Sequence, residues 1–122
     1  MKNYFQKLKK PYLIAEIGIN HNGSEKIAKN MIKVAKETGF NAVKFQKRNP
    51  DICVPEYQKN ILRETPWGII TYLKYKKKIE LNYKQLKNLM IYSQKLGLDF
   101  FCSSFDIYSL KEIKNISKFN KV

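Results

Sequence analysis

Tyr12-Leu-Ile-Ala-Glu-Ile-Gly18 is a short, largely apolar run that ends at a glycine. Such a run is typical of a β-strand buried on both faces, as strands are in parallel sheets. Asn22-Gly-Ser24 follows as a turn whose serine can cap a helix. Apolar side chains then recur at helical spacing over residues 25–38, the helix ends at Gly39, and residues 40–46 form a second apolar run. This pattern predicts a strand–helix–strand unit with a right-handed crossover.

Strands and helices continue to alternate in the rest of the chain. A long connection runs from Lys47 to about Asn82, and within it Thr65-Pro-Trp-Gly68 predicts a break with short helices on either side. Beyond it, hydrophobic spacing predicts helices at 83–96 and 109–117, a strand at 98–104, and the start of a fourth strand at 119–122. Strict alternation predicts a parallel α/β fold. A doubly wound sheet and a (β/α)₈ barrel both fit it.

The chain carries a formal net charge of +14, which is compatible with nucleic acid, a membrane surface or an anionic substrate as partner. Only Arg48 and Arg63 are arginines among its 24 basic residues. Proteins that bind phosphates and base edges favour arginine because its guanidinium can donate two parallel hydrogen bonds. The excess of lysine therefore predicts solvated helix faces, and we expect no nucleic-acid partner.

Composition also predicts the type of domain and its compartment. The 122 residues suffice for one domain, which we place at residues 11–122 after a basic lead at residues 1–10. No apolar run approaches the roughly 20 residues that a membrane helix needs, and no secretion signal follows the lead. Cys53 and Cys102 are too few for a disulfide framework or a zinc site. We therefore expect a cytoplasmic protein with two reduced thiols and no membrane partner.

Polar residues occur inside the first two predicted strands, where a buried strand has no structural need of them. Because side chains alternate along a strand, Lys44 and Gln46 face one side of the sheet while Val43 and Phe45 face the other. Glu16 occupies the matching side of the first strand. An unpaired ammonium in the interior is costly, so Lys44 is expected to pair with Glu16 or with a ligand. A structural ion pair and a strand edge in contact with water are the alternatives to a functional role.

Further polar candidates lie at the strand ends. His21 is the only histidine, and a single histidine in an asparagine-rich loop does not make a metal site. Ser103, Ser104 and Asp106 suit either phosphate and hydroxyl binding or the capping of the next helix. The glycines match neither the GxGxxG nor the Walker spacing, so the chain has no phosphate-binding fingerprint of those types.

Three segments in this order, residues 14–23, 41–46 and 99–106, resemble the N-acetylneuraminate (sialic acid) synthase family of the NeuB type. This family includes the legionaminate, pseudaminate and spore-coat polysaccharide homologues. The resemblance runs through almost the whole chain from Pro11 onward. It implies an α/β fold made of the first three βα units of a TIM (β/α)₈ barrel, truncated before or within the fourth strand.

The resemblance also implies a reaction. Phosphoenolpyruvate would condense with an N-acyl hexosamine such as N-acetylmannosamine to give a nine-carbon 2-keto sugar acid, with release of phosphate. A divalent cation (Mn²⁺ or Mg²⁺) would be required, and the full-length enzyme would be a homodimer. Such chemistry needs cations for phosphate and carboxylate, a metal that polarises the aldehyde, and a carboxylate for proton or hydroxyl handling.

The residues that match the family's motifs take their roles from it. Lys44 would hold phosphoenolpyruvate and Glu16 would orient the sugar or water, which makes these two the catalytic candidates. The substrate-binding candidates are Asn20, His21, Gln46, Ser103 and Ser104. Ser103 stands where the family has the threonine of its Ser-Thr-Pro-Phe strand end.

The family's two metal-binding histidines, further phosphate-binding residues and its C-terminal antifreeze-like domain all correspond to positions beyond Val122. The ligands of the cation are therefore expected outside this chain, and the 122 residues alone are expected to be inactive. Two other hypotheses remain open at this point. One is a non-catalytic remnant or small anion-binding module that keeps Lys44, and the other is a basic nucleic-acid-binding protein.

Overall fold

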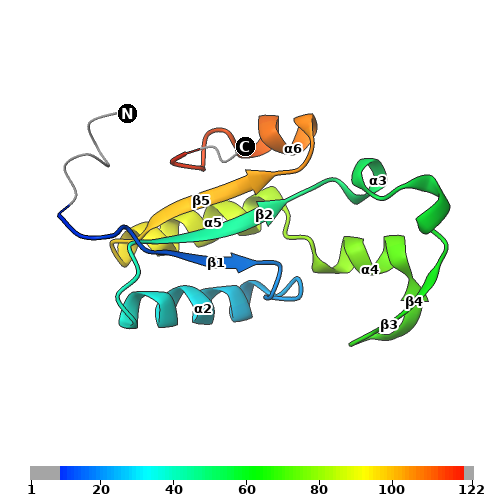
Figure 1. The fold of residues 1–122 in the computed structure, drawn as a ribbon, viewed down its shortest axis with the longest axis horizontal. Coiled ribbons are helices and arrows are strands. Elements are labelled where there is room, and N and C mark those ends of the chain that lie inside the picture. The colour runs from blue at the N-terminus through cyan, green and yellow to red at the C-terminus, as the bar shows by residue number, and fades with distance from the viewer. Residues whose placement is uncertain (1–8, 120–122) are drawn as a thin grey trace.

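The computed structural model describes residues 9–119 and contains a parallel sheet of three strands. The strands β1 (Ile14–Gly18), β2 (Ala42–Lys47) and β5 (Asp99–Ser104) lie in the order β1-β2-β5 (Figure 1). The helix α2 (Glu25–Glu37) joins the first two strands. The predicted strand–helix–strand unit and the parallel α/β class are therefore confirmed, with boundaries within two residues of the prediction.

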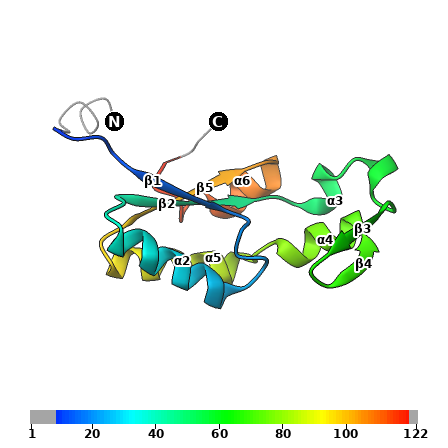
Figure 2. The ribbon, with the colours of Figure 1, turned by 60° about the horizontal axis from the view of Figure 1, so that its bottom comes forward.

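The helices α2, α5 (Tyr83–Lys95) and α6 (Ile107–Ile113) bury their apolar sides in a single core on one face of the sheet. Figure 2 shows α2 and α5 on the same side of the strands. The core includes Ile32, Leu86, Leu89 and Ile113 from the helices and Val43, Phe45, Phe100 and Cys102 from the strands. A doubly wound sheet carries helices on both faces, whereas a barrel carries them on its outer face only. The one-sided cover and the sequential strand order therefore differ from the doubly wound arrangement.

Polar side chains fix where the helices begin. Ser24 Oγ accepts a hydrogen bond from the backbone N–H of Ile27 at 3.2 Å, so the predicted N-cap is confirmed. Asp106 Oδ1 accepts from the N–H of Ser109 at 2.8 Å and caps α6 in the same way. The predicted helix at 109–117 is therefore shifted, because this cap starts it two residues earlier. Ile116, which was predicted to be helical, enters the core from the turn that follows.

The connection between β2 and α5 forms a separate lobe at one end of the molecule (Figure 1). Its elements are α3 (Pro50–Cys53), the 3₁₀ turn η1 (Glu56–Gln58), the strands β3 (Leu62–Thr65) and β4 (Gly68–Thr71), and α4 (Tyr72–Ile79). The last two strands pair as an antiparallel hairpin. The predicted short helices are present on either side of residues 65–68, as α3 and η1 before them and α4 after them, but the unpredicted hairpin strands separate these helices from the turn.

The hairpin forms because its turn is locally satisfied. Thr65 Oγ1 accepts from the N–H of Trp67 at 3.2 Å and donates to the carbonyl of Gly68 at 2.7 Å. Gly68 has a φ of +86°, which a residue with a side chain rarely adopts. Ile69 and Ile70 then favour an extended backbone because they are β-branched.

Two expectations fall at the chain ends. Most of the predicted basic lead and residues 120–122 of the predicted fourth strand lie outside the described residues, and Phe119 is not in a strand. Among the described residues, no helix is long and apolar enough to cross a membrane.

Candidate active site

The face of the sheet opposite the helices carries a chain of polar contacts across all three strands. Lys44 on β2 is only 8% exposed, and its Nζ forms an ion pair with Glu16 Oε2 on β1. The same Nζ donates to Ser103 Oγ on β5 at 3.1 Å. The register explains these contacts, because Glu16 lies beside Lys44 and Ser103 beside Gln46. The predicted pairing of Glu16 with Lys44 is confirmed.

This cluster is open to solvent on one side. The side chain of Glu16 is 48% exposed, whereas that of Lys44 is 10% exposed. An ammonium has three N–H donors, and among the described residues two groups contact Nζ, the Ser103 hydroxyl as a hydrogen-bond acceptor and the Glu16 carboxylate as an ion-pair partner. Lys44 therefore combines a partly desolvated positive charge with a remaining donor, which is a suitable arrangement for holding an anion.

Gln46 lies on the same face as Lys44, two residues further along β2 and close to Gly18. A β-carbon on Gly18 would stand 3.4 Å from Gln46 Nε2 and 3.5 Å from Glu16 Oε1. Gly18 also has a φ of +58°, a conformation that glycine adopts without strain. The amide of Gln46 and the carboxylate of Glu16 therefore border the same small space at the carboxyl ends of β1 and β2.

Two largely shielded side chains that sequence reasoning missed support Gln46. Arg48 Nη2 donates to Gln46 Oε1, and Arg48 Nε lies 3.1 Å from Glu80 Oε1 as an ion pair without hydrogen-bond geometry. Burial raises the pKa of Glu80 above its ordinary value, although the N–H and guanidinium of Arg48 oppose this shift. One signal was available: Arg48 is one of only two arginines in a lysine-rich chain. Arginine is preferred where one side chain must contact two acceptors.

The loop after β1 turns His21 away from this face. His21 is 1% exposed, its Nδ1 accepts the N–H of Gly23 at 3.0 Å, and its ring lies 5.9 Å from that of Phe45. Phe45 belongs to the core on the helix side. Asn20 is exposed and donates to the carbonyl of Ile17 at 3.0 Å. The structure therefore does not bring His21 to Lys44, and both loop residues hold the loop in shape.

We expect His21 to make the folded state sensitive to acid. Burial lowers the pKa of His21 from its ordinary value of 6.5, against a smaller opposing effect of its hydrogen bond to the Gly18 backbone. The unfolded chain then takes up a proton near pH 6.5 that the folded chain refuses. Stability therefore falls as the pH drops from about 6.5, by at most about 1.4 kcal/mol per pH unit.

Urea unfolding at pH 7.5 and pH 5.5 measures this loss, with His21→Gln as the comparison. The variant is expected to lose less stability over this interval, because His21 is the only histidine in the sequence. The raised pKa of Glu80 acts in the opposite direction, but it does so equally in both proteins. Equal losses in the two proteins contradict the prediction.

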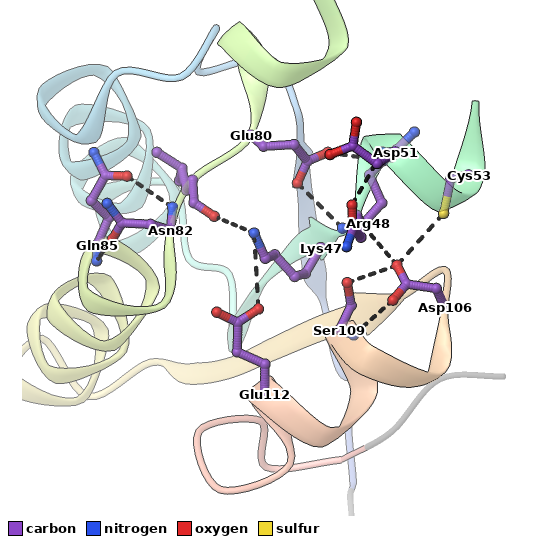
Figure 3. Close-up of polar contacts among 12 residues, drawn as sticks. Lys47, Arg48, Asp51, Cys53, Glu80, Asn82, Gln85, Asp106, Ser109 and Glu112 are labelled. Carbon is purple, nitrogen blue, oxygen red and sulfur yellow. Dashed lines mark hydrogen bonds and ion pairs between the residues drawn. The ribbon is translucent and has the colours of Figure 1, made fainter. Parts of the chain in front are cut away.

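The two serines at the end of β5 point to opposite faces. Ser103 lies beside Gln46 and contacts Lys44, whereas Ser104 lies beside Lys47 in the register. Lys47 belongs to the helix side, where its Nζ donates to the carbonyl of Leu81 at 2.9 Å (Figure 3). Of the two predicted substrate-binding serines, the structure therefore brings only Ser103 to the Lys44 cluster.

Asp106 and Cys53 belong to a structural cluster beyond the strand ends (Figure 3). Asp106 Oδ2 accepts from the N–H of Asn49 at 2.7 Å and from Ser109 Oγ at 2.7 Å. Burial alone would raise the pKa of Asp106, but these hydrogen bonds hold it below its ordinary value. Cys53 Sγ lies 3.5 Å from the same carboxylate, and burial raises its pKa. A thiol with a raised pKa is a poor nucleophile at neutral pH, and the hydrogen bonds of Asp106 cap α6 and hold the Asn49 turn.

The described residues do not provide a metal site. Within residues 9–119, no three side chains of His, Cys, Asp or Glu gather closely enough to hold an ion. Cys53 and Cys102 are both free, and burial raises the pKa of Cys102 to about 12, so neither offers a ready thiolate. Residues 9–119 by themselves therefore gather no ligand set for the divalent cation that the family resemblance implies, whose ligands are predicted to lie outside them.

Comparison with known proteins identifies the family of this chain. The sequence pattern that defines the NeuB family matches residues 31–122. The chain belongs to the NeuB family. Among its relatives, N-acetylneuraminate-9-phosphate synthase of Mus musculus is 38% identical over 97 residues, which cover 78% of this chain and 27% of the relative. N,N'-diacetyllegionaminic acid synthase of Legionella pneumophila is 36% identical, over 81% of this chain and 28% of the relative.

Solved structures agree with this NeuB assignment. The N-acetylneuraminic acid synthetase of Leptospira borgpetersenii matches with a TM-score of 0.76 and 29% identity, over 91% of this chain and 35% of that one. A spore coat polysaccharide biosynthesis protein E of Chromobacterium violaceum matches with a TM-score of 0.73 and 25% identity. The chain thus spans roughly a third or less of the length of these NeuB relatives.

Proposed function

We propose that this chain forms the phosphoenolpyruvate-binding part of a sugar acid synthase. In the complete reaction, phosphoenolpyruvate condenses with an N-acyl hexosamine to give a nine-carbon 2-keto sugar acid and phosphate. The observation that carries the proposal is the Glu16–Lys44–Ser103 cluster on the free face of the sheet. Membership of a family whose relatives are named as synthases of sialic and legionaminic acids supports it.

Lys44 binds the anionic substrate in this proposal. Phosphoenolpyruvate carries phosphate and carboxylate groups, and a nearly buried ammonium attracts an anion more strongly than a solvated one does. Ser103 supplies a hydroxyl beside the same ammonium, 3.1 Å from it, and can donate to a substrate oxygen. The pair therefore orients phosphoenolpyruvate and stabilises the charge on its phosphate as that group leaves.

Glu16 handles the sugar or the water. Carbon 3 of phosphoenolpyruvate forms the new bond to the aldehyde carbon, and the aldehyde oxygen gains a proton. Water then adds at carbon 2 and loses a proton, and the bond between carbon 2 and the phosphate oxygen breaks to release phosphate. The half-exposed carboxylate of Glu16 can accept a hydrogen bond from the sugar or from this water while Lys44 balances its charge.

The remaining features of the family belong to the same proposal. The one-sided helical cover and the sequential strand order support a sheet that forms part of a (β/α)₈ barrel, with the polar face inside. A divalent cation bound by residues outside those described, a homodimer and a cytoplasmic location are proposed with it. No step is assigned to the cation here, because the described residues do not gather a ligand set.

Sugar-dependent release of phosphate from phosphoenolpyruvate tests the function in the full-length protein. We expect phosphate release with N-acetylmannosamine or a related N-acyl hexosamine in the presence of Mn²⁺, and a product whose mass equals both substrates plus water minus phosphate. Binding of phosphoenolpyruvate without any such product, over a panel of N-acyl hexosamines, contradicts a synthase and favours the anion-binding module. Absence of phosphoenolpyruvate binding contradicts both.

A further inference from the structure

The side-chain amide of Gln46 lies between Arg48, which contacts its oxygen, and Glu16, which lies near its nitrogen. Arg48 Nη2 contacts Gln46 Oε1 on one side. On the other side, Gln46 Nε2 and Glu16 Oε1 both lie within 3.5 Å of the point where a β-carbon of Gly18 would stand. A guanidinium has only donors, so the amide oxygen must face Arg48. The amide NH₂ group must then face Gly18 and Glu16.

Arg48 is itself held firmly in place. Its backbone N–H donates to Glu80 Oε2 at 3.2 Å, and its Nε lies 3.1 Å from Glu80 Oε1. Its guanidinium also lies 4.3 Å from the centre of the Phe105 ring. The side chains of Arg48 and Glu80 are 14% and 8% exposed, so this pair is shielded from solvent. The planar guanidinium of arginine can contact Glu80 and Gln46 at the same time. A lysine could not replace it in this role, because its single ammonium lies on a flexible chain.

We propose that Arg48 is a positioning residue that orients the Gln46 amide for sugar recognition. The proposal rests on the proposed function and extends it. None of the described residues accepts a hydrogen bond from Gln46 Nε2, so its donors are available to a ligand. Glu16 beside it can only accept when ionised. A hydroxyl both donates and accepts, so the pair recognises one hydroxyl group of the acceptor sugar, which donates to Glu16 and accepts from Gln46.

Kinetics of the full-length protein test the consequence for the sugar. Arg48→Met is combined with Glu80→Gln, so that no buried carboxylate is left unpaired. We expect KM for the sugar to rise about tenfold, the equivalent of one lost hydrogen bond, while KM for phosphoenolpyruvate changes less than about twofold. Lys47→Met is the matched control. It removes a similarly shielded cation from the last residue of β2, directly before Arg48, where the side chain faces the helices, and leaves KM for the sugar unchanged.

A double-mutant cycle with Gln46→Ala separates positioning from a general structural effect. If Arg48 acts through Gln46, the Arg48→Met and Glu80→Gln changes cause no further rise in KM for the sugar once Gln46 is alanine. Additive effects, or an equal loss of affinity for both substrates, overturn the proposal.

Nuclear magnetic resonance tests the orientation without catalysis. In the wild type, the side-chain NH₂ protons of Gln46 are expected to show NOEs to the α-protons of Gly18, and these weaken when Arg48 and Glu80 are replaced. Missing NOEs, or NOEs of unchanged strength in the variant, overturn the orientation of the amide. A wild type that shows the NOEs but produces no sugar acid contradicts the proposed function and leaves the orientation in place.

Discussion

Replacing Lys44 with methionine is expected to weaken phosphoenolpyruvate binding by about a hundredfold or more, the equivalent of roughly 3 kcal/mol. Methionine has a similar length but no charge, so the substrate phosphate would lose its buried ammonium partner. The substitution should not unfold the protein, because Glu16 is half exposed and remains solvated without its partner. Isothermal titration with phosphoenolpyruvate measures the change.

Lys29→Met is a matched control for the loss of one positive charge. Lys29 also forms an ion pair, with Glu25 at 3.0 Å, but it lies on the outer surface of α2 and is 43% exposed. An exposed pair of this kind contributes little, so its removal should leave phosphoenolpyruvate affinity within about twofold of the wild type. Affinity of Lys44→Met within threefold of this control contradicts the assignment of Lys44, and with it the proposed site.

Replacing Gly23 with alanine is expected to destabilise the fold by about 3–5 kcal/mol. The new β-carbon would stand 2.1 Å from the carbonyl oxygen of Lys78, which is far too close for two atoms that are not bonded. Gly23 also has a φ of +75°, which alanine adopts only with strain. The loop that carries His21 packs directly on the end of α4 here, so the backbone must move. Thermal unfolding followed by circular dichroism measures the loss.

Gly39→Ala separates the two causes. Gly39 has a φ of +86°, but a β-carbon there would meet no atom within 4 Å. This variant therefore carries the backbone strain alone, at about 1–2 kcal/mol. A loss of stability in Gly23→Ala that does not exceed the loss in Gly39→Ala shows that the loop does not pack tightly on α4.

Most of the regular structure could be predicted from the sequence because it depends on local periodicity. Burial in the core shows in the spacing of apolar residues, and this holds for the strands β1, β2 and β5 and the helices α2 and α5. The hairpin of β3 and β4 was missed because it leaves no such pattern. Its Leu62 and Ile69 are 65% and 70% exposed, and its two strands pair only with each other.

The candidate site could likewise be predicted only in part from the sequence. Alternation along a strand placed Glu16, Lys44 and Gln46 on one face, because the direction of a side chain in a strand follows from its position. The same rule separates Ser103 from Ser104, but it could not say which serine faces Lys44. That choice depends on the register between β2 and β5, which brings Ser103 to Lys44 although the two residues lie 59 positions apart in the chain.

The sequence by itself determined the family, the alternation of strands and helices, and the shared sheet face of Lys44 and Glu16, since motifs and periodicity are properties of neighbouring residues. Only the tertiary structure decided that His21 packs against Phe45 and that Arg48, paired with Glu80, supports Gln46. Arg48 and Glu80 are 32 positions apart, and the lobe between them brings them together. Contacts of this range arise from packing, which no local pattern of residues records.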